Sequence, residues 1–101
     1  MSKRNMNIPK HKIADFCRKW KVIEFALFGS VLSKDFRPDS DIDVLVSFSE
    51  DAKWSLFDIA RMQNELNEIF GREVDLVEKE AIRNPFRRHS ILRSKEVIYA
   101  A

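Results

Sequence analysis

The feature that most constrains this chain is a pair of aspartates at the head of an apolar run. Asp41 and Asp43 are two residues apart, and the residues from Ile42 to Phe48 are mainly aliphatic, a pattern typical of a β-strand. Alternate residues of a strand share a face and lie roughly 6–7 Å apart, so both carboxylates can converge on one metal centre. Hard oxygen ligands of this kind suit Mg²⁺, and two such ions about 3.5–4 Å apart serve in-line nucleotidyl displacement.

A Gly-Ser pair upstream adds a second part to this site. Asp39 and Ser40 on their own are also turn residues, so the carboxylates could belong to an ordinary solvated turn. However, another β-like run, residues 22–28, ends directly at Gly29 and Ser30. Glycine lets the backbone approach a phosphate closely, the following amides attract anions, and the serine hydroxyl adds a donor. A strand, a phosphate-binding turn and a strand with metal ligands make one coherent site for a nucleoside triphosphate.

The rest of the sequence predicts alternating helices and strands in a single domain, residues 1–101. The expected elements are a helix from Pro9 onward, strands 22–28 and 41–48, a helix 55–70 that stops at Gly71, a strand 73–78, a helix 85–94 and a short apolar tail 97–99. The longer helix is expected to place Leu56, Ile59, Gln63, Leu66 and Phe70 along one side. This order predicts an α/β fold, a small mixed β-sheet with helices on one face and the other face free for chemistry.

The third candidate carboxylate is Asp75, in the predicted strand 73–78. Val74 and Leu76 face away from Asp75, just as Ile42 faces away from Asp41 and Asp43. If the two strands are neighbours in the sheet, Asp75 joins the aspartate pair. On pattern alone the favoured interpretation of Asp75 is an ordinary half-exposed strand residue.

These residues carry a family resemblance. Gly29, Ser30, Asp41, Asp43 and Asp75 resemble the Gly-Ser…Asp-x-Asp…Asp signature of the DNA polymerase β-like nucleotidyltransferase superfamily. More narrowly, the chain is similar to the minimal nucleotidyltransferases, the MNT antitoxins that pair with a HEPN-domain toxin. The likeness covers residues 22–99, and its further segments are 38–46, 54–58 and 84–87.

The resemblance implies an activity and roles for these residues. It implies a polymerase β-like fold that binds ATP with two Mg²⁺ ions and transfers AMP to a hydroxyl, plausibly a tyrosine, of a cognate HEPN ribonuclease toxin. Gly29 and Ser30 would hold the β- and γ-phosphates, and Asp41 and Asp43 would ligate the metals. Asp75 would ligate one ion and help to deprotonate the acceptor hydroxyl. The chain would therefore form a hetero-oligomer with the toxin.

The sequence departs from the family pattern directly after the Gly-Ser pair. Many minimal members have an arginine there and a glycine a few residues later, where this chain has Val31 and Lys34. The arginine that would make one of the phosphate contacts is therefore missing. Lys34 or Arg37 is a candidate to supply a replacement charge.

Two other functions fit the same family. One is an antitoxin that masks its toxin by binding alone, with a vestigial active site, and the other is a transferase acting on a small molecule such as an aminoglycoside. The intact Asp41, Asp43 and Asp75 argue against the first. The lack of room for an acceptor-binding domain in 101 residues argues against the second.

Composition and charge indicate which other partners and compartments to expect. The net charge is only +2, but residues 41–80 carry eleven acids against four Lys or Arg, whereas the regions on either side are basic. Without aromatic interleaving or a nucleic-acid motif, we do not expect direct nucleic-acid binding. No run approaches the roughly 20 apolar residues of a membrane span and no signal peptide is recognisable, so the protein is expected to be cytoplasmic with no membrane contact.

The remaining candidate residues have simpler interpretations. The sequence predicts a buried structural thiol at Cys17 and solvated imidazoles at His11 and His89. Trp54, Phe57 and Tyr99 are expected to pack in the core or as a lid, with an interface role open for Tyr99. The densest basic cluster consists of Arg83, Arg87, Arg88 and Arg93. It can form a solvated helix face or lie near the triphosphate or a partner.

Overall fold

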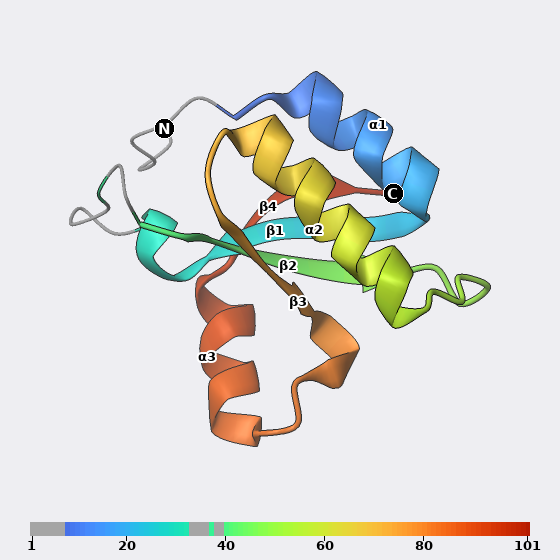
Figure 1. Ribbon diagram of the computed structural model, residues 1–101. Helices are drawn as coiled ribbons and strands as arrows, with labels where there is room; N and C mark the ends of the chain where they lie inside the picture. Colours follow the sequence, from blue (N-terminus) through green and yellow to red (C-terminus); the bar gives the residue numbers. More distant parts are fainter. Residues whose placement is uncertain (1–7, 33–36, 38–39) are drawn as a thin grey trace.

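In the part of the chain that the structure describes, four strands form one sheet and three helices pack against it (Figure 1). The computed structural model describes residues 8–32, 37 and 40–101. In chain order the elements are α1 (Lys10–Trp20), β1 (Val22–Phe28), the 3-10 turn η1 (Gly29–Leu32), β2 (Ile42–Phe48), α2 (Leu56–Phe70), β3 (Val74–Glu78), the 3-10 turn η2 (Lys79–Ala81), α3 (Pro85–Ser94) and β4 (Glu96–Ala100). None of the helices in these ranges has the length and apolar composition needed to cross a membrane.

The sheet is mixed, in the order β3-β2-β1-β4. β2 and β3 run parallel, with α2 as the crossover between them, whereas β1 is antiparallel to both β2 and β4. The apolar tail expected at residues 97–99 is therefore an additional strand, in which Tyr99 lies opposite Phe25 of β1. The predicted mixed α/β sheet is confirmed.

Helices α1 and α2 cover one face of the sheet and enclose the main core. The buried residues of α1 recur at helical spacing: Ile13, Phe16, Cys17 and Trp20. Phe25 of β1 lies at the centre of this layer, with its ring edge-on to Phe16 and stacked on Phe70 at centroid distances of 6.1 and 6.5 Å. The spacing of apolar residues in α1 was thus sufficient to identify its buried face.

The opposite face is also partly covered, which corrects the expectation of helices on one face only. Figure 1 shows α3 on the other side of the sheet from α1 and α2. A second, smaller core forms there from Ala26, Phe28, Leu45, Ile82 and Ile91. The physical reason is that the run Val44-Leu45-Val46 is apolar without alternation, so Leu45 offers apolar surface on the face that Asp43 shares. At the starts of β2 and β3, beyond this smaller core, the same face carries Asp43 and Asp75.

The first turn of α2 is held by a capping box. The backbone N–H of Asp58 donates to Ser55 Oγ at 3.2 Å, and the backbone N–H of Ser55 donates to the Asp58 carboxylate at 3.0 Å. The buried face of the helix is centred on Met62 and Leu66. Leu56 lies six residues before Met62, which places it about a third of a turn away from that face, and it points to solvent. The expectation that Leu56 lies on the packed side of this helix was wrong.

A charged cluster ties β4 and η2 to β1. Glu24 of β1 accepts a hydrogen bond from Lys95 and lies 3.6 Å from Lys79 Nζ, and all three side chains are largely buried. The hydrogen bond from Lys95 acts against partial burial and holds the pKa of Glu24 below its usual value. The cluster therefore stabilises the fold as long as Glu24 is ionised.

Candidate active site

Three carboxylates meet where β2 and β3 begin. Asp41 directly precedes β2, Asp43 is its second residue, and Asp75 is the second residue of β3. The parallel pairing puts Asp43 and Asp75 in register, side by side on strands about 4.8 Å apart. The sequence left open whether β2 and β3 are neighbours, and this pairing brings Asp75 to the aspartate pair.

The electrostatics of Asp43 reflect this crowding. Partial burial raises the pKa of its carboxyl group, and the negative charges of Asp75 and Asp41 raise it further. Asp43 is half-buried, whereas Asp41 and Asp75 are exposed. Like charges so close together disfavour ionisation. A cation or a positively charged group that binds there therefore stabilises the ionised carboxylates.

The Gly-Ser turn lies directly against these carboxylates. Phe28, the last residue of β1, pairs with Asp43, so the chain enters η1 beside the acidic cluster. Gly29 has a positive φ of 75°, and a Cβ at this position would lie 2.3 Å from Asp43 Oδ2. The backbone N–H of Ser30 donates to the Asp43 carboxylate, and Ser30 Oγ donates to the carbonyl of Asp41 at 3.4 Å. Glycine is therefore required here both by conformation and by space.

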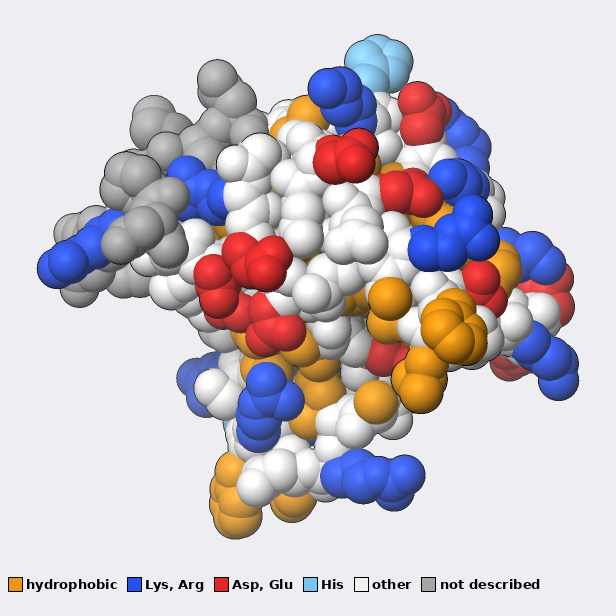
Figure 2. Space-filling view, viewed as in Figure 1, with side chains coloured by type: hydrophobic (Ala, Val, Ile, Leu, Met, Phe, Trp, Pro, Cys, Tyr) orange, Lys and Arg blue, Asp and Glu red, His pale blue; other side chains and the backbone are white. Residues whose placement is uncertain are grey.

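A positive charge from α3 faces the acidic group. The guanidinium of Arg87 lowers the pKa of Asp43, in opposition to burial and the neighbouring aspartates. In Figure 2, acidic side chains gather left of the centre, where β2 and β3 begin in the same view, and a Lys or Arg side chain lies beneath them toward α3. The sequence alone does not decide whether the arginine cluster forms a solvated helix face or lies near the triphosphate or a partner. The structure brings Arg87 of this cluster toward the site.

The donor set suits a hard divalent cation. Three carboxylates without a nitrogen or sulfur ligand are the chemistry that Mg²⁺ prefers, and the raised pKa of Asp43 is what a cation would relieve. In the part of the chain that the structure describes, however, no three His, Cys, Asp or Glu side chains are already arranged as a metal site. The carboxylates would therefore have to adjust their side-chain torsions to hold an ion.

Several other predicted residues can now be placed. Cys17 is buried, and burial raises the pKa of its thiol to about 12, so it is an unreactive structural residue. Trp54 packs edge-on against Trp20 and its Nε1 donates to the Trp20 carbonyl at 3.0 Å, as expected for a core residue. Phe57, in contrast, is exposed, so the prediction that it packs was wrong. Asp39 and Lys34 lie outside the described residues.

Tyr99 and the two histidines behave as expected from the sequence. Tyr99 is half-buried and packs against the main core, while His11 and His89 are exposed. Arg88 donates to the carbonyl of Lys79 at 2.7 Å and so has a structural role, which separates it from its neighbour Arg87.

Comparison with known proteins identifies the family. The sequence profile of the nucleotidyltransferase domain matches residues 10–98, and the chain therefore belongs to this family of nucleotide-transferring enzymes. A relative in Methanocaldococcus jannaschii, named "Putative protein adenylyltransferase MJ1217", is 36% identical over 81 residues, which cover 80% of this chain and 79% of that protein.

Solved structures agree with this assignment. A structure described as "putative minimal nucleotidyltransferase" is 29% identical, with a TM-score of 0.73 over 91% of this chain and 96% of that one. The same fold occurs in a tri-AMPylated Shewanella oneidensis HEPN toxin in complex with MNT antitoxin, where the matched chain is 19% identical, with a TM-score of 0.65 over 91% of this chain and 70% of that one. The resemblance to the minimal nucleotidyltransferases is confirmed.

Proposed function

We propose that this protein is an antitoxin that transfers AMP from ATP to a hydroxyl group, plausibly of a tyrosine, on a cognate HEPN ribonuclease toxin and so neutralises it. The observation that carries the proposal is the meeting of Asp41, Asp43 and Asp75 beside Gly29 and Ser30 at an accessible end of the sheet. The names of its relatives support adenylyl transfer, and the HEPN complex with the same fold supports the choice of partner.

The three aspartates are the residues that would hold Mg²⁺. When bound, the ions supply positive charge that orients the triphosphate and stabilises the charge that develops on it during displacement. Asp43 is already placed by the N–H of Ser30 and by contact with Gly29, whereas the exposed Asp41 and Asp75 are free to turn toward a ligand. The half-buried residue thus sets the position of the site, and the two exposed residues adapt to it.

The Gly-Ser turn and α3 are the parts suited to the phosphates. Because Gly29 has no side chain, the Asp43 carboxylate can lie against the backbone of η1, which brings the turn and the carboxylate to the same site. The Ser30 hydroxyl makes a long hydrogen bond of 3.4 Å, which it can exchange for a phosphate oxygen. Arg87 of α3 supplies positive charge near Asp43, in a chain where Val31 replaces the usual arginine of the family.

The transfer itself needs one bond to form and one to break. The acceptor oxygen attacks the α-phosphorus of ATP, the bond from that phosphorus to the bridging oxygen of the β-phosphate breaks, and pyrophosphate leaves. The acceptor proton passes to the exposed carboxylate of Asp75, which then releases it to solvent. The product is a toxin that carries AMP through a phosphodiester bond.

A loss-of-charge experiment tests this proposal. Asp41→Asn combined with Asp43→Asn should abolish transfer of α-³²P-labelled AMP to the HEPN partner while leaving the far-ultraviolet circular dichroism spectrum unchanged. Asp15→Asn, which removes an exposed acid on α1, is the matched control and should transfer at the wild-type rate. Wild-type labelling by the double variant would rule out these carboxylates as the catalytic group.

A further inference from the structure

Two adjacent large apolar side chains stand in solvent at the start of α2. Leu56 is 87% exposed and Phe57 is 84% exposed. A single exposed apolar residue is common, whereas two neighbouring ones form an apolar patch of the kind found at interaction sites, and Leu56 also lines a groove. Figure 2 shows hydrophobic side chains gathered on the right, in the region of the N-terminal end of α2. The capping box holds the backbone of this turn, so both side chains project from an ordered turn of the helix.

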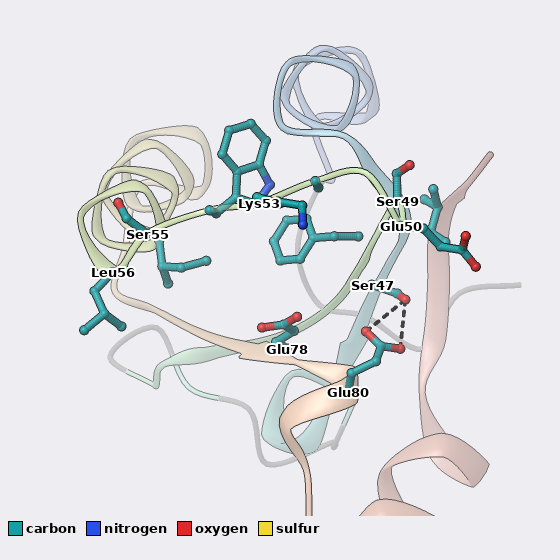
Figure 3. A pocket seen from close by; sticks show the side chains of 13 residues that line it. Ser47, Ser49, Glu50, Lys53, Ser55, Leu56, Glu78 and Glu80 are labelled. Atoms are coloured by element: carbon teal, nitrogen blue, oxygen red, sulfur yellow. Dashed lines mark hydrogen bonds between the residues drawn. The ribbon is translucent and has the colours of Figure 1, made fainter.

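A groove of about 730 Å³ lies beside this pair (Figure 3). Leu56 forms part of its wall, and further apolar lining comes from Ile23, Phe48, Trp54 and Ile59. The groove is located at the end of β2 opposite to the catalytic carboxylates. Ser47 is four strand residues beyond Asp43, a distance of about 13 Å.

The charges around the groove are predominantly negative. Glu50, Glu78 and Glu80 line it, against a single Lys53. Glu80 is held in place by Ser47, whose hydroxyl lies 3.1 and 3.2 Å from the two carboxylate oxygens (Figure 3). Among the described residues, neither Glu50 nor Glu78 has a cationic partner. Three carboxylates and one ammonium give the groove a net charge of −2, which favours a basic occupant.

We infer that the groove and the Leu56–Phe57 pair dock the protein substrate of the enzyme, through a segment with an apolar anchor flanked by lysine or arginine. This inference rests on the proposed function, because it assigns a surface to the toxin that the active site modifies. A typical interface buries about 800 Å² on each partner, so one partner can cover the groove and still reach the carboxylates about 13 Å away. A partner bound in the groove thereby brings its acceptor hydroxyl to the carboxylates at the other end of β2.

The inference is tested with the cognate HEPN-domain toxin that the proposed function assigns to this protein. Titration calorimetry measures its affinity for two variants, Leu56→Ser with Phe57→Ser and Glu50→Gln with Glu78→Gln. Both should bind at least tenfold more weakly than the wild type, with KM for the partner raised by the same factor and kcat within about twofold. The affinity of the charge variant should also fall less steeply with salt. Mg-ATP binding should be unchanged in both.

Two control variants sharpen the test. Val97→Thr changes an exposed apolar residue of β4, and Glu68→Gln removes an exposed acid from α2 outside the groove. Both should bind the partner as the wild type does. Unchanged affinity of the charge variant, which alters only surface carboxylates, overturns the inference, as does equal weakening by the controls. Self-association of the wild type that these substitutions abolish would assign the groove to a second copy instead.

The same data separate the inference from the proposed function. If the groove variants lose the partner while the wild-type protein binds it and transfers no AMP, the docking surface is correct and the adenylyltransferase proposal is wrong. If AMP transfer occurs with full affinity in both groove variants, the enzyme is correct and the docking surface is wrong.

Discussion

Gly29→Ala and Gly71→Ala form a matched pair that tests the contact between the Gly-Ser turn and the carboxylates. Both glycines have positive φ, 75° and 70°, so an alanine at either position is strained by about 1–2 kcal/mol. A Cβ at Gly71 would meet nothing within 4 Å, whereas one at Gly29 would lie 2.3 Å from Asp43 Oδ2. Restoring an ordinary contact of 3.4 Å requires the Asp43 carboxylate to move by about 1 Å.

The two variants should therefore lose similar stability but different amounts of activity. Each should unfold at a temperature lower by about 4–8 °C per kcal/mol of strain, measured by circular dichroism. Since a 1 Å misplacement of a catalytic group costs on the order of a hundredfold, Gly29→Ala should transfer labelled AMP about a hundredfold more slowly. Gly71→Ala should remain within about twofold of the wild-type rate. If Gly29→Ala transfers AMP as fast as Gly71→Ala, the reasoning about this contact is refuted.

Three further substitutions test other parts of the account by thermal unfolding. Glu24→Gln should lower the free energy of unfolding by about 1–2 kcal/mol at neutral pH, whereas Asp15→Asn, in an exposed ion pair, should lower it by less than about 0.5 kcal/mol. Because the pKa of Glu24 is lowered on folding, the difference between the two variants should disappear as the pH falls through the pKa of Glu24 in the folded protein. Asp43→Asn should raise the unfolding temperature at neutral pH without nucleotide. The pKa of Asp43 is raised on folding, so the folded state favours the neutral carboxyl group and is destabilised once the pH rises and this group ionises, which an asparagine avoids. Lower stability of this variant at pH 7 would contradict this. Ser55→Ala should cost about 1 kcal/mol through loss of the capping box, and no change would show that other contacts hold the first turn of α2.

Local sequence signals predicted most of the fold. Helical spacing identified the buried face of α1, and the apolar runs identified β1 and β2. Gly71 ends α2 in a left-handed conformation, as its position after the helix indicated. These features depend on residues close together in the chain, which is why the sequence contains them.

Features that depend on contacts between distant parts of the chain could not be predicted from local sequence patterns. The proximity of Asp75 to Asp43 follows from the parallel pairing of β2 and β3, which no local pattern specifies. The cover that α3 provides on the second face and the strand character of residues 96–100 likewise arise from packing against β1 and β2. Leu56 had the residue type of a core position, and only the orientation of α2 shows that it faces solvent.

The central claim, that this protein acts by covalent modification, is tested most directly by its stoichiometry. A HEPN partner in excess is incubated with ATP, Mg²⁺ and a small molar fraction of this protein, and its mass and ribonuclease activity are then measured. Turnover predicts that most of the partner gains the mass of AMP and loses activity, and that Asp43→Asn does not produce this at any substoichiometric dose. Inactivation that requires equimolar protein, is indifferent to ATP and survives Asp43→Asn would contradict the account and establish masking instead.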